Sequence, residues 1–372
     1  MKFESYPFEK LNNLLKEIEP NSDFEPLVLT IGEPQFETPR FILDEFRLTA
    51  PMLNKYPKTA GEERLRQAIL GFVERRFGVK LDNSQIIPTF GTREVLFNFP
   101  QYLLFDKKEP KMAFTNPFYQ IYEGAAIASR AKVKYINLTK ENGFKAVIDD
   151  EIKESDLVIL NFPNNPTAGV MNKEELALWV EAALEYDFVL LNDECYSELY
   201  THSAPSSLLE ASELVGNREF KNILVVNSIS KRSSAPGLRS GFIAGDKEIL
   251  RGYLQYRTYA GCAIPLPLQY AAAEAWDDDV HVIEARGRYK KNFELASKIL
   301  GVKEPEATFY IWLEVGDELE FTKRAYKEYN VKVLPGSFLG REGAGRGYVR
   351  IALVYDEKRC EEALKRIKKV LG

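Results

Sequence analysis

Lys231 follows a short apolar run, at a position where its ammonium group must be either paired or desolvated at a cost in free energy. The run, Ile223–Val226, is short and β-branched, which predicts a buried strand. Ser228 and Ser230 precede the lysine, and Arg239 follows it by eight residues. A lysine amine in this setting can form a Schiff base, and hydroxyl and guanidinium groups can hold an anion such as a phosphate. The alternative is a polar loop with a solvated lysine, and this stretch alone fits both interpretations.

The composition is that of an ordinary soluble globular protein, because 45% of the 372 residues are hydrophobic and 28% are charged. That length accommodates one large domain and a smaller one. The net charge of -5 argues against nucleic acid or an anionic membrane as the main partner. The first residues lack the apolar stretch of a signal peptide, and no window reaches the roughly 18 apolar residues of a membrane span. We therefore expect a cytoplasmic protein.

The chain has only three cysteines, without CxxC spacing, and only two histidines. Cys195, Cys262 and Cys360 cannot all pair, which favours a reducing compartment. His202 and His281 are too few for a histidine-rich metal site, so we expect no metal. They also nearly exclude Ser-His-Asp chemistry. If the protein is an enzyme, lysine is the leading candidate for its proton carrier.

An alternation of apolar strands and helical patterns runs through the middle of the chain. It predicts a mostly parallel sheet that is covered by helices on both faces. In such sheets, ligands bind beyond the carboxyl ends of the strands. The expected strands are 112–114, 133–136, 157–161, 188–192, 223–227 and 242–244.

Polar segments follow four of these strands, and together they indicate one site at a single edge of the sheet. They are Asn116–Tyr119, Phe162–Gly169, Asp193–Tyr196 and Ser228–Lys231. A further candidate is the helix start at Gly91 and Thr92, where Thr92 is expected to be the N-cap and free backbone N–H groups could seat a phosphate. The alternative is an ordinary helix start that binds nothing.

The chain is expected to form two domains. Residues 38–281 form the large domain, and residues 1–37 and 282–372 form a smaller α+β domain. The smaller domain begins with an amphipathic helix near residues 8–18 and ends with a helix over residues 357–370.

Several single residues could bind a ring-shaped cofactor and a substrate, each with a structural alternative. Asp193 ends an apolar strand, where it could cap a helix or pair with a protonated pyridine nitrogen. Tyr196 and Asn165 could reach the phenolic oxygen of the same ring. Tyr119 could stack on the ring or be a half-buried aromatic residue. Arg350, inside an apolar strand, could bind a carboxylate bidentately or form a structural ion pair.

These motifs, in this order over nearly the whole chain, resemble the class I pyridoxal-phosphate aminotransferases of fold type I, whose α/β fold has a large α/β/α domain and a smaller α+β domain. The most specific motif is Ser228-x-Ser230-Lys231 followed by Arg239. The resemblance implies that Lys231 carries pyridoxal 5'-phosphate as a Schiff base and moves the proton between an amino acid and the cofactor, with a keto acid as second substrate. It also implies a homodimer with shared active sites. The resemblance implies that the phosphate is bound by Gly91, Thr92, Ser228, Ser230, Arg239 and, from the partner subunit of the dimer, Tyr56. It implies that the ring is bound by Asp193, Tyr119, Tyr196 and Asn165. The substrate α-carboxylate is implied to bind to Arg350 and near Gly32.

Two longer strings, residues 231–242 and 257–263, are similar to the N-succinyldiaminopimelate aminotransferases of bacterial lysine synthesis. This resemblance implies N-succinyl-L,L-diaminopimelate as the amino donor, with 2-oxoglutarate and glutamate as the other pair. The distal carboxylates of that donor need cations, and Arg93, Arg232 and Arg257 are the candidates. The alternative for each arginine is ordinary surface charge. Alternative functions on the same fold are an aspartate aminotransferase, a pyridoxal-phosphate β-lyase and a non-catalytic pyridoxal-phosphate sensor module.

Overall fold

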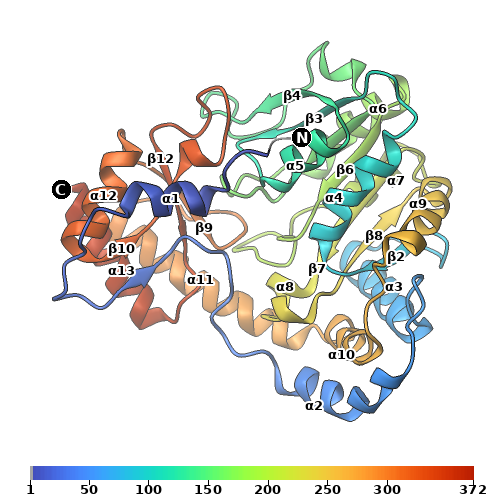
Figure 1. The fold of residues 1–372 in the computed structure, drawn as a ribbon, viewed down its shortest axis with the longest axis horizontal. Helices are drawn as coiled ribbons and strands as arrows, with labels where there is room; N and C mark the ends of the chain where they lie inside the picture. Colours follow the sequence, from blue (N-terminus) through green and yellow to red (C-terminus); the bar gives the residue numbers. More distant parts are fainter. Residues whose placement is uncertain (1–2) are drawn as a thin grey trace.

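Seven strands form the main sheet of the computed structural model, which describes residues 3–372 (Figure 1). Their order is β2-β8-β7-β6-β5-β3-β4, and all neighbours are parallel except β8, which is antiparallel to β7 and β2. This confirms the expected α/β fold with a mostly parallel sheet, and each expected strand has its ends shifted by no more than two residues. The strands are β2 (Ile86–Thr89), β3 (Lys111–Asn116), β4 (Lys132–Asn137), β5 (Leu157–Leu160), β6 (Val189–Asp193), β7 (Ile223–Ser228) and β8 (Gly241–Gly245).

Helices cover both faces of this sheet, so its strands are continuous apolar runs. Successive side chains point to opposite faces, and therefore Leu190 belongs to the core on one face and Leu191 to the core on the other. The first face is covered mainly by α3 (Glu63–Phe77), α6 (Lys173–Glu185), α7 (Leu208–Leu214) and α10 (Leu266–Asp277). The second face is covered by α4 (Thr92–Leu103), α5 (Ile121–Ala128) and α9 (Lys247–Ala260).

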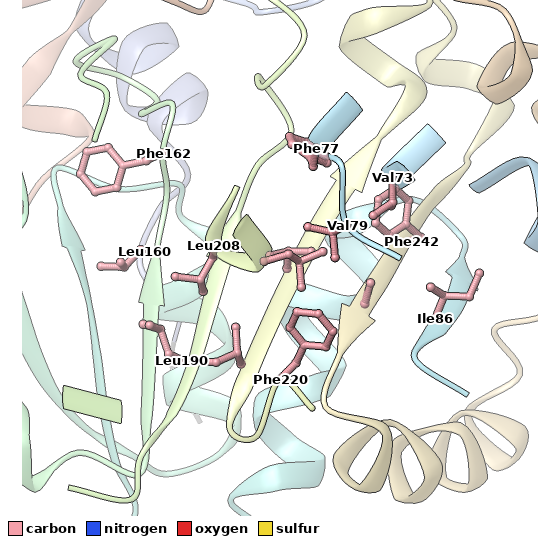
Figure 2. Close-up of a cluster of buried hydrophobic side chains, with 14 of the residues drawn as sticks. Val73, Phe77, Val79, Ile86, Leu160, Phe162, Leu190, Leu208, Phe220 and Phe242 are labelled. Atoms are coloured by element: carbon pink, nitrogen blue, oxygen red, sulfur yellow. The ribbon is translucent and has the colours of Figure 1, made fainter. Parts of the chain in front are cut away.

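Figure 2 shows part of the first core, in which Leu190, Phe220 and Phe242 belong to one cluster. Each of these three side chains is at most 1% exposed. Truncating a leucine buried in this way costs about 2–5 kcal/mol. The core therefore holds the strands, and the polar segments at their ends, in fixed positions.

A second unit has its own core and is built from both ends of the chain (Figure 1, left). Strand β1 (Leu27–Val28) pairs in parallel with β10 (Val331–Lys332), which joins the N-terminal segment to the C-terminal part. Three further strands form an antiparallel sheet in the order β11-β12-β9. The domain boundaries near residues 38 and 281 stay a prediction. The remaining elements of this unit are α1 (Pro7–Leu15), β9 (Tyr310–Glu314), β11 (Leu334–Pro335), β12 (Tyr348–Ala352), α12 (Glu318–Tyr329) and α13 (Glu357–Leu371).

Helix α11 (Val280–Leu300) connects the two units (Figure 1). It begins three residues after α10 ends, and its Phe293, Ala296 and Leu300 belong to the core of the second unit. Among residues 3–372, no helix combines the length and apolar character needed to span a bilayer. The short helical elements are α2 (Arg40–Thr49), α8 (Ile229–Arg232), η1 (Ala50–Asn54), η2 (Ile152–Glu154), η3 (Pro236–Leu238) and η4 (Gly336–Phe338).

Candidate active site

A cavity of about 750 Å³ lies at the carboxyl ends of β5, β6 and β7, and residues of the second unit complete its lining. All four polar segments that follow strands contribute to it, as expected for a mostly parallel sheet. Gly91 lies directly before the lining residue Thr92, whereas Tyr56 does not line the cavity and is fully exposed. The other expected site residues that line it are Gly32, Tyr119, Asn165, Asp193, Tyr196, Ser228, Ser230, Lys231, Arg239 and Arg350.

Lys231 lies just beyond the end of β7, in the short helix α8, and its side chain is partly buried. Its Nζ donates a hydrogen bond to the carbonyl oxygen of Gly32 and lies 5.8 Å from the centre of the Phe309 ring. Burial lowers the pKa of the amine to about 8, and the positive charges of Arg350 and Arg239 act in the same direction. No carboxylate among residues 3–372 forms an ion pair with this amine. The structure therefore shows a desolvated lysine and not a solvated one.

Ser228, Ser230 and Arg239 offer donors to an anion near Lys231. The two hydroxyl oxygens are 2.9 Å apart, and the Ser230 backbone N–H donates to Ser228 Oγ at 3.1 Å. Arg239 donates to the carbonyl oxygens of Pro236 at 2.8 Å and Phe90 at 3.4 Å. In the described part of the chain, this guanidinium has no carboxylate partner. Its charge is therefore available to an anionic ligand.

Gly91, and not Thr92, occupies the N-cap position of α4, which corrects the expected cap. The φ of Gly91 is 72°, a value that favours glycine, and a Cβ at this position would overlap the Arg239 guanidinium. Arg239 can therefore lie against the start of α4 only because residue 91 has no side chain. Thr92 is the first helical residue, and its Oγ1 lies 3.2 Å from Cys195 Sγ.

Asp193 ends β6 and is held by two donors. Tyr122 donates its hydroxyl to Oδ2 at 2.9 Å, and the Cys195 backbone N–H donates to Oδ1 at 3.2 Å. A turn and not a helix follows this strand, so the capping role considered for Asp193 is wrong. Burial raises the pKa of the carboxyl, and these hydrogen bonds oppose that effect.

Arg350 reaches the cavity from β12 in the second unit and is 5% exposed. Its guanidinium donates to Asn165 Oδ1 at 2.7 Å and to the Thr30 carbonyl oxygen at 2.6 Å, and it lies 4.4 Å from the centre of the Tyr310 ring. Its buried Nε has no hydrogen-bond partner. Over residues 3–372 no carboxylate pairs with it, so the structural ion pair considered for Arg350 is wrong.

Tyrosines line the cavity around these groups. Tyr196 and Tyr310 have hydroxyl oxygens 2.9 Å apart, and Tyr119 accepts a hydrogen bond from Arg93 Nε at 2.8 Å. Sequence reasoning missed Tyr310, Tyr122, Cys195 and the lining residues 6–8. Tyr122 comes three residues after Tyr119 and Tyr310 follows Phe309 in an apolar stretch, but neither position carries a motif.

Arg257 is not a cavity residue, which corrects one of the three expected cations for a distal carboxylate. It is 0% exposed and forms a bidentate ion pair with Glu94, at 2.9 Å from Nε to Oε1 and 2.8 Å from Nη2 to Oε2. Glu94 also accepts a hydrogen bond from the Phe90 backbone N–H at 3.1 Å. Arg257 therefore fixes the start of α4, and the alternative of ordinary surface charge is wrong as well.

Arg232 is likewise not a cavity cation, because it is 0% exposed. Its guanidinium lies beside the rings of Phe72 and Trp276, at 4.9 Å and 5.1 Å from their centres. It bonds to the end of α10 and pairs with Asp279 at 3.1 Å. Of the three arginines, only Arg93 lines the cavity. No cluster of His, Cys, Asp or Glu suited to a metal ion occurs within residues 3–372.

The sequence matches the family model of the class I and II aminotransferases over residues 25–367. The chain therefore belongs to this family, which is known to use pyridoxal phosphate and to act on amino acids and keto acids.

Individual relatives cover nearly the whole chain. The crystal structure of aminotransferase AspB from Helicobacter pylori is 50% identical, covers 99% of both chains and superposes with a TM-score of 0.97. The 4-dedimethylamino-4-oxo-anhydrotetracycline transaminase OxyQ of Streptomyces rimosus is 32% identical over 91% of this chain and 92% of its own. An LL-diaminopimelate aminotransferase of Syntrophobacter fumaroxidans is 28% identical over 98% of this chain and 96% of its own. The family and these names indicate a transaminase.

We expect the Lys231 amine of the cofactor-free protein to react with an amine-directed reagent with a pH midpoint near 8, because burial favours the neutral, nucleophilic form. Labelling at a series of pH values, followed by peptide mass spectrometry, measures this midpoint. The exposed Lys55 in the same samples is the internal control. An equal pH dependence for Lys231 and Lys55 would contradict the environment described for Lys231.

Proposed function

We propose that the cavity binds pyridoxal 5'-phosphate, that Lys231 attaches it, and that the protein is a transaminase for an amino donor with a distal carboxylate. One observation carries the proposal. The desolvated amine of Lys231 and the guanidinium of Arg350, which has no carboxylate partner in the described chain, share a cavity that is lined by both units. The residues fit the cofactor. Ser228 and Ser230 supply hydroxyl donors and Arg239 supplies a guanidinium without a carboxylate partner in the described chain, which suits a phosphate. Asp193 supplies a buried carboxylate, which suits the pyridine nitrogen.

In this proposal, Arg239, the two serine hydroxyls and the backbone N–H groups at the start of α4 hold the phosphate. The Asp193 carboxylate, which is held in place by the Tyr122 hydroxyl, would accept a hydrogen bond from the protonated pyridine nitrogen. Asn165 and Tyr196 would donate to the ring oxygen and Tyr119 would cover the ring face, and all three line the cavity. When bound, the cofactor supplies the electron-withdrawing ring on which transamination depends.

The chain itself supplies substrate binding and proton transfer. Arg350 binds the α-carboxylate of the amino acid, because no carboxylate of the described chain pairs with its guanidinium, and the backbone near Gly32 lies beside it. Lys231 Nζ would accept the proton from the substrate α-carbon and hold it for return during transfer of the amino group. A pKa of about 8 suits this role, because roughly a tenth of the amine is then neutral at pH 7 and can accept a proton, far more than for a solvated lysine.

For the substrate, we propose N-succinyl-L,L-diaminopimelate as amino donor, with 2-oxoglutarate and glutamate as the other pair in lysine biosynthesis. Arg93 lines the cavity, and its only side-chain partner within the described chain is the Tyr119 hydroxyl. It is therefore the available cation for a distal carboxylate. The similarity to LL-diaminopimelate aminotransferase supports a donor of this type. The alternatives are an aspartate aminotransferase and a β-lyase on the same fold.

A panel of amino donors with 2-oxoglutarate as acceptor tests this proposal. We expect succinyldiaminopimelate to be the best donor and Arg93→Gln to lower its kcat/KM about 10- to 100-fold, the effect of losing one charge-assisted hydrogen bond. Alanine, which has no distal carboxylate, should be affected much less. Arg218→Gln removes an exposed arginine outside the cavity and is the matched control.

Each alternative predicts a different outcome of the same panel. A higher kcat/KM for aspartate than for succinyldiaminopimelate would indicate an aspartate aminotransferase. Release of pyruvate and ammonia without a keto-acid acceptor would indicate a β-lyase. If Arg93→Gln lowered kcat/KM equally for all donors, Arg93 would not be the residue that binds the distal carboxylate.

We also propose a homodimer in which Tyr56 reaches the phosphate of the neighbouring subunit. Leu48 and Leu53 are 74% and 69% exposed on α2 and η1, next to the fully exposed Tyr56, and such apolar surface is typical of an interface. We expect sedimentation velocity to give twice the chain mass and Tyr56→Ala to retain pyridoxal phosphate less tightly as an intact dimer. A single-chain mass, or unchanged retention, would contradict the shared site.

A further inference from the structure

The residues directly after Lys231 are fixed to the junction of α10 and α11. Arg232, 0% exposed, donates to the carbonyl oxygens of Ala275 and Asp278 and pairs with Asp279. Because α8 has only four residues, its position depends on contacts of this kind more than on its own helical hydrogen bonds.

Ser233 is held by a second contact to the same junction. Its Oγ lies 2.9 Å from His281 Nε2, and His281 Nδ1 is hydrogen-bonded to Asp278 Oδ1. Burial lowers the pKa of His281, which favours the neutral ring. With the Asp278 carboxylate as acceptor, the ring proton lies on Nδ1, so Nε2 accepts the proton of the Ser233 hydroxyl. The Phe41 ring packs on His281, at 5.4 Å between centres.

Hydroxyl, imidazole and carboxylate in this order also occur in acyl-transfer enzymes. Ser233 is only 1% exposed, however, so no acyl group reaches its oxygen. The arrangement holds Ser233 in place and is not a hydrolytic site.

The chain passes between the two units twice, through residues 35–41 and through α11, and both connections contact Ser233 or Ser234. Helix α11 carries His281 near its start and Phe293 and Leu300 in the core of the second unit. The other crossing, residues 35–41, contributes Thr38, whose hydroxyl donates to the Ser234 carbonyl oxygen at 2.7 Å. A displacement of the second unit would therefore act on residues 233 and 234, two and three positions beyond Lys231.

We propose that the Asp278–His281–Ser233 line, together with the Thr38–Ser234 bond, positions the Lys231 amine and couples it to the second unit. His281 is a positioning residue for the transamination and touches neither substrate nor cofactor. This inference rests on the proposed function, because it takes Lys231 to be the reacting amine. The inference gives a role to His281, Ser233 and Asp278, which take no part in the chemistry proposed for the cavity.

Charged and titratable groups other than His281 also surround the two ends of this connection. Near Lys231 they are Cys195, Arg350, Glu33, Arg239 and Asp193. Near His281 they are Asp278, Arg232 and Asp279, with Glu37, Glu284, Arg40 and Arg288 lining the adjacent cavity. The test therefore changes only Ser233 and His281, and these groups stay constant.

The test compares Ser233→Ala, His281→Leu and His281→Gln with His202→Leu, which changes the exposed second histidine and is the matched control. In Ser233→Ala and His281→Leu, we expect the pH midpoint of Lys231 labelling in the cofactor-free protein to rise by about 1 unit, because the released loop lets water reach the amine. The midpoint of the visible absorption of the loaded protein should rise with it. The kcat should fall about tenfold with little change in KM. His281→Gln, which keeps an acceptor for Ser233, should recover most of the loss.

Two outcomes would overturn the inference. One is an unchanged Lys231 midpoint in both Ser233→Ala and His281→Leu. The other is a lower thermal unfolding temperature with no change in midpoint or kcat, which would indicate a structural role alone. If His281→Leu does not fold, Ser233→Ala still decides, because it removes one oxygen atom from the site. Failure of the proposed function is distinguishable, since the unsubstituted protein would then show neither bound pyridoxal phosphate nor transamination, whereas the Lys231 midpoint of the cofactor-free protein would still report the effect of the substitutions.

Discussion

The Lys231 amine is largely buried at the cavity wall without a carboxylate partner in the described chain, and the arrangement of the site depends on this constraint. A paired lysine would stay protonated and could not accept a proton near pH 7. Here the positive charges of Arg350 and Arg239 add to the effect of burial on the pKa. The carbonyl oxygen of Gly32 satisfies the amine without a counter-charge. The parallel sheet supplies the position, because β7 ends at the same edge of the sheet as the parallel strands β3, β5 and β6, and a polar segment follows each of them there.

Whether an arginine has a carboxylate partner separates its structural and functional roles in this protein. Arg257 and Arg232 are fully buried and paired, with Glu94 and Asp279, and each fixes an element beside the cavity. Arg350 and Arg239 have no carboxylate partner within residues 3–372, and both line the cavity. A buried, paired arginine stabilises the fold only as part of its pair. An unpaired guanidinium in a cavity can instead bind an anionic substrate or cofactor.

The sequence predicts the sheet and the place of the site well, since short apolar runs followed by polar segments follow directly from burial on both faces of a parallel sheet. It does not predict which arginine is buried. Arg232 lies one residue after Lys231, yet it packs against Phe72 and Trp276, which are far away in the chain. The sequence predicts Thr92 as the N-cap of α4, one residue after the observed cap at Gly91, for a similar reason. The requirement for glycine at residue 91 comes from Arg239, which lies in another segment. The contacts of His281 with Ser233 and Asp278 likewise depend on tertiary packing and carry no sequence motif.

The central claim is that Lys231 is the residue that attaches the cofactor. Reduction of the pyridoxal-phosphate-loaded protein with borohydride, followed by proteolysis and mass spectrometry, locates the modified residue directly. The account predicts the reduced cofactor on Lys231 and on no other lysine, in the peptide that continues into Arg232 and Ser233. A cofactor on a different lysine, or a protein that binds pyridoxal phosphate without any covalent adduct, would contradict it.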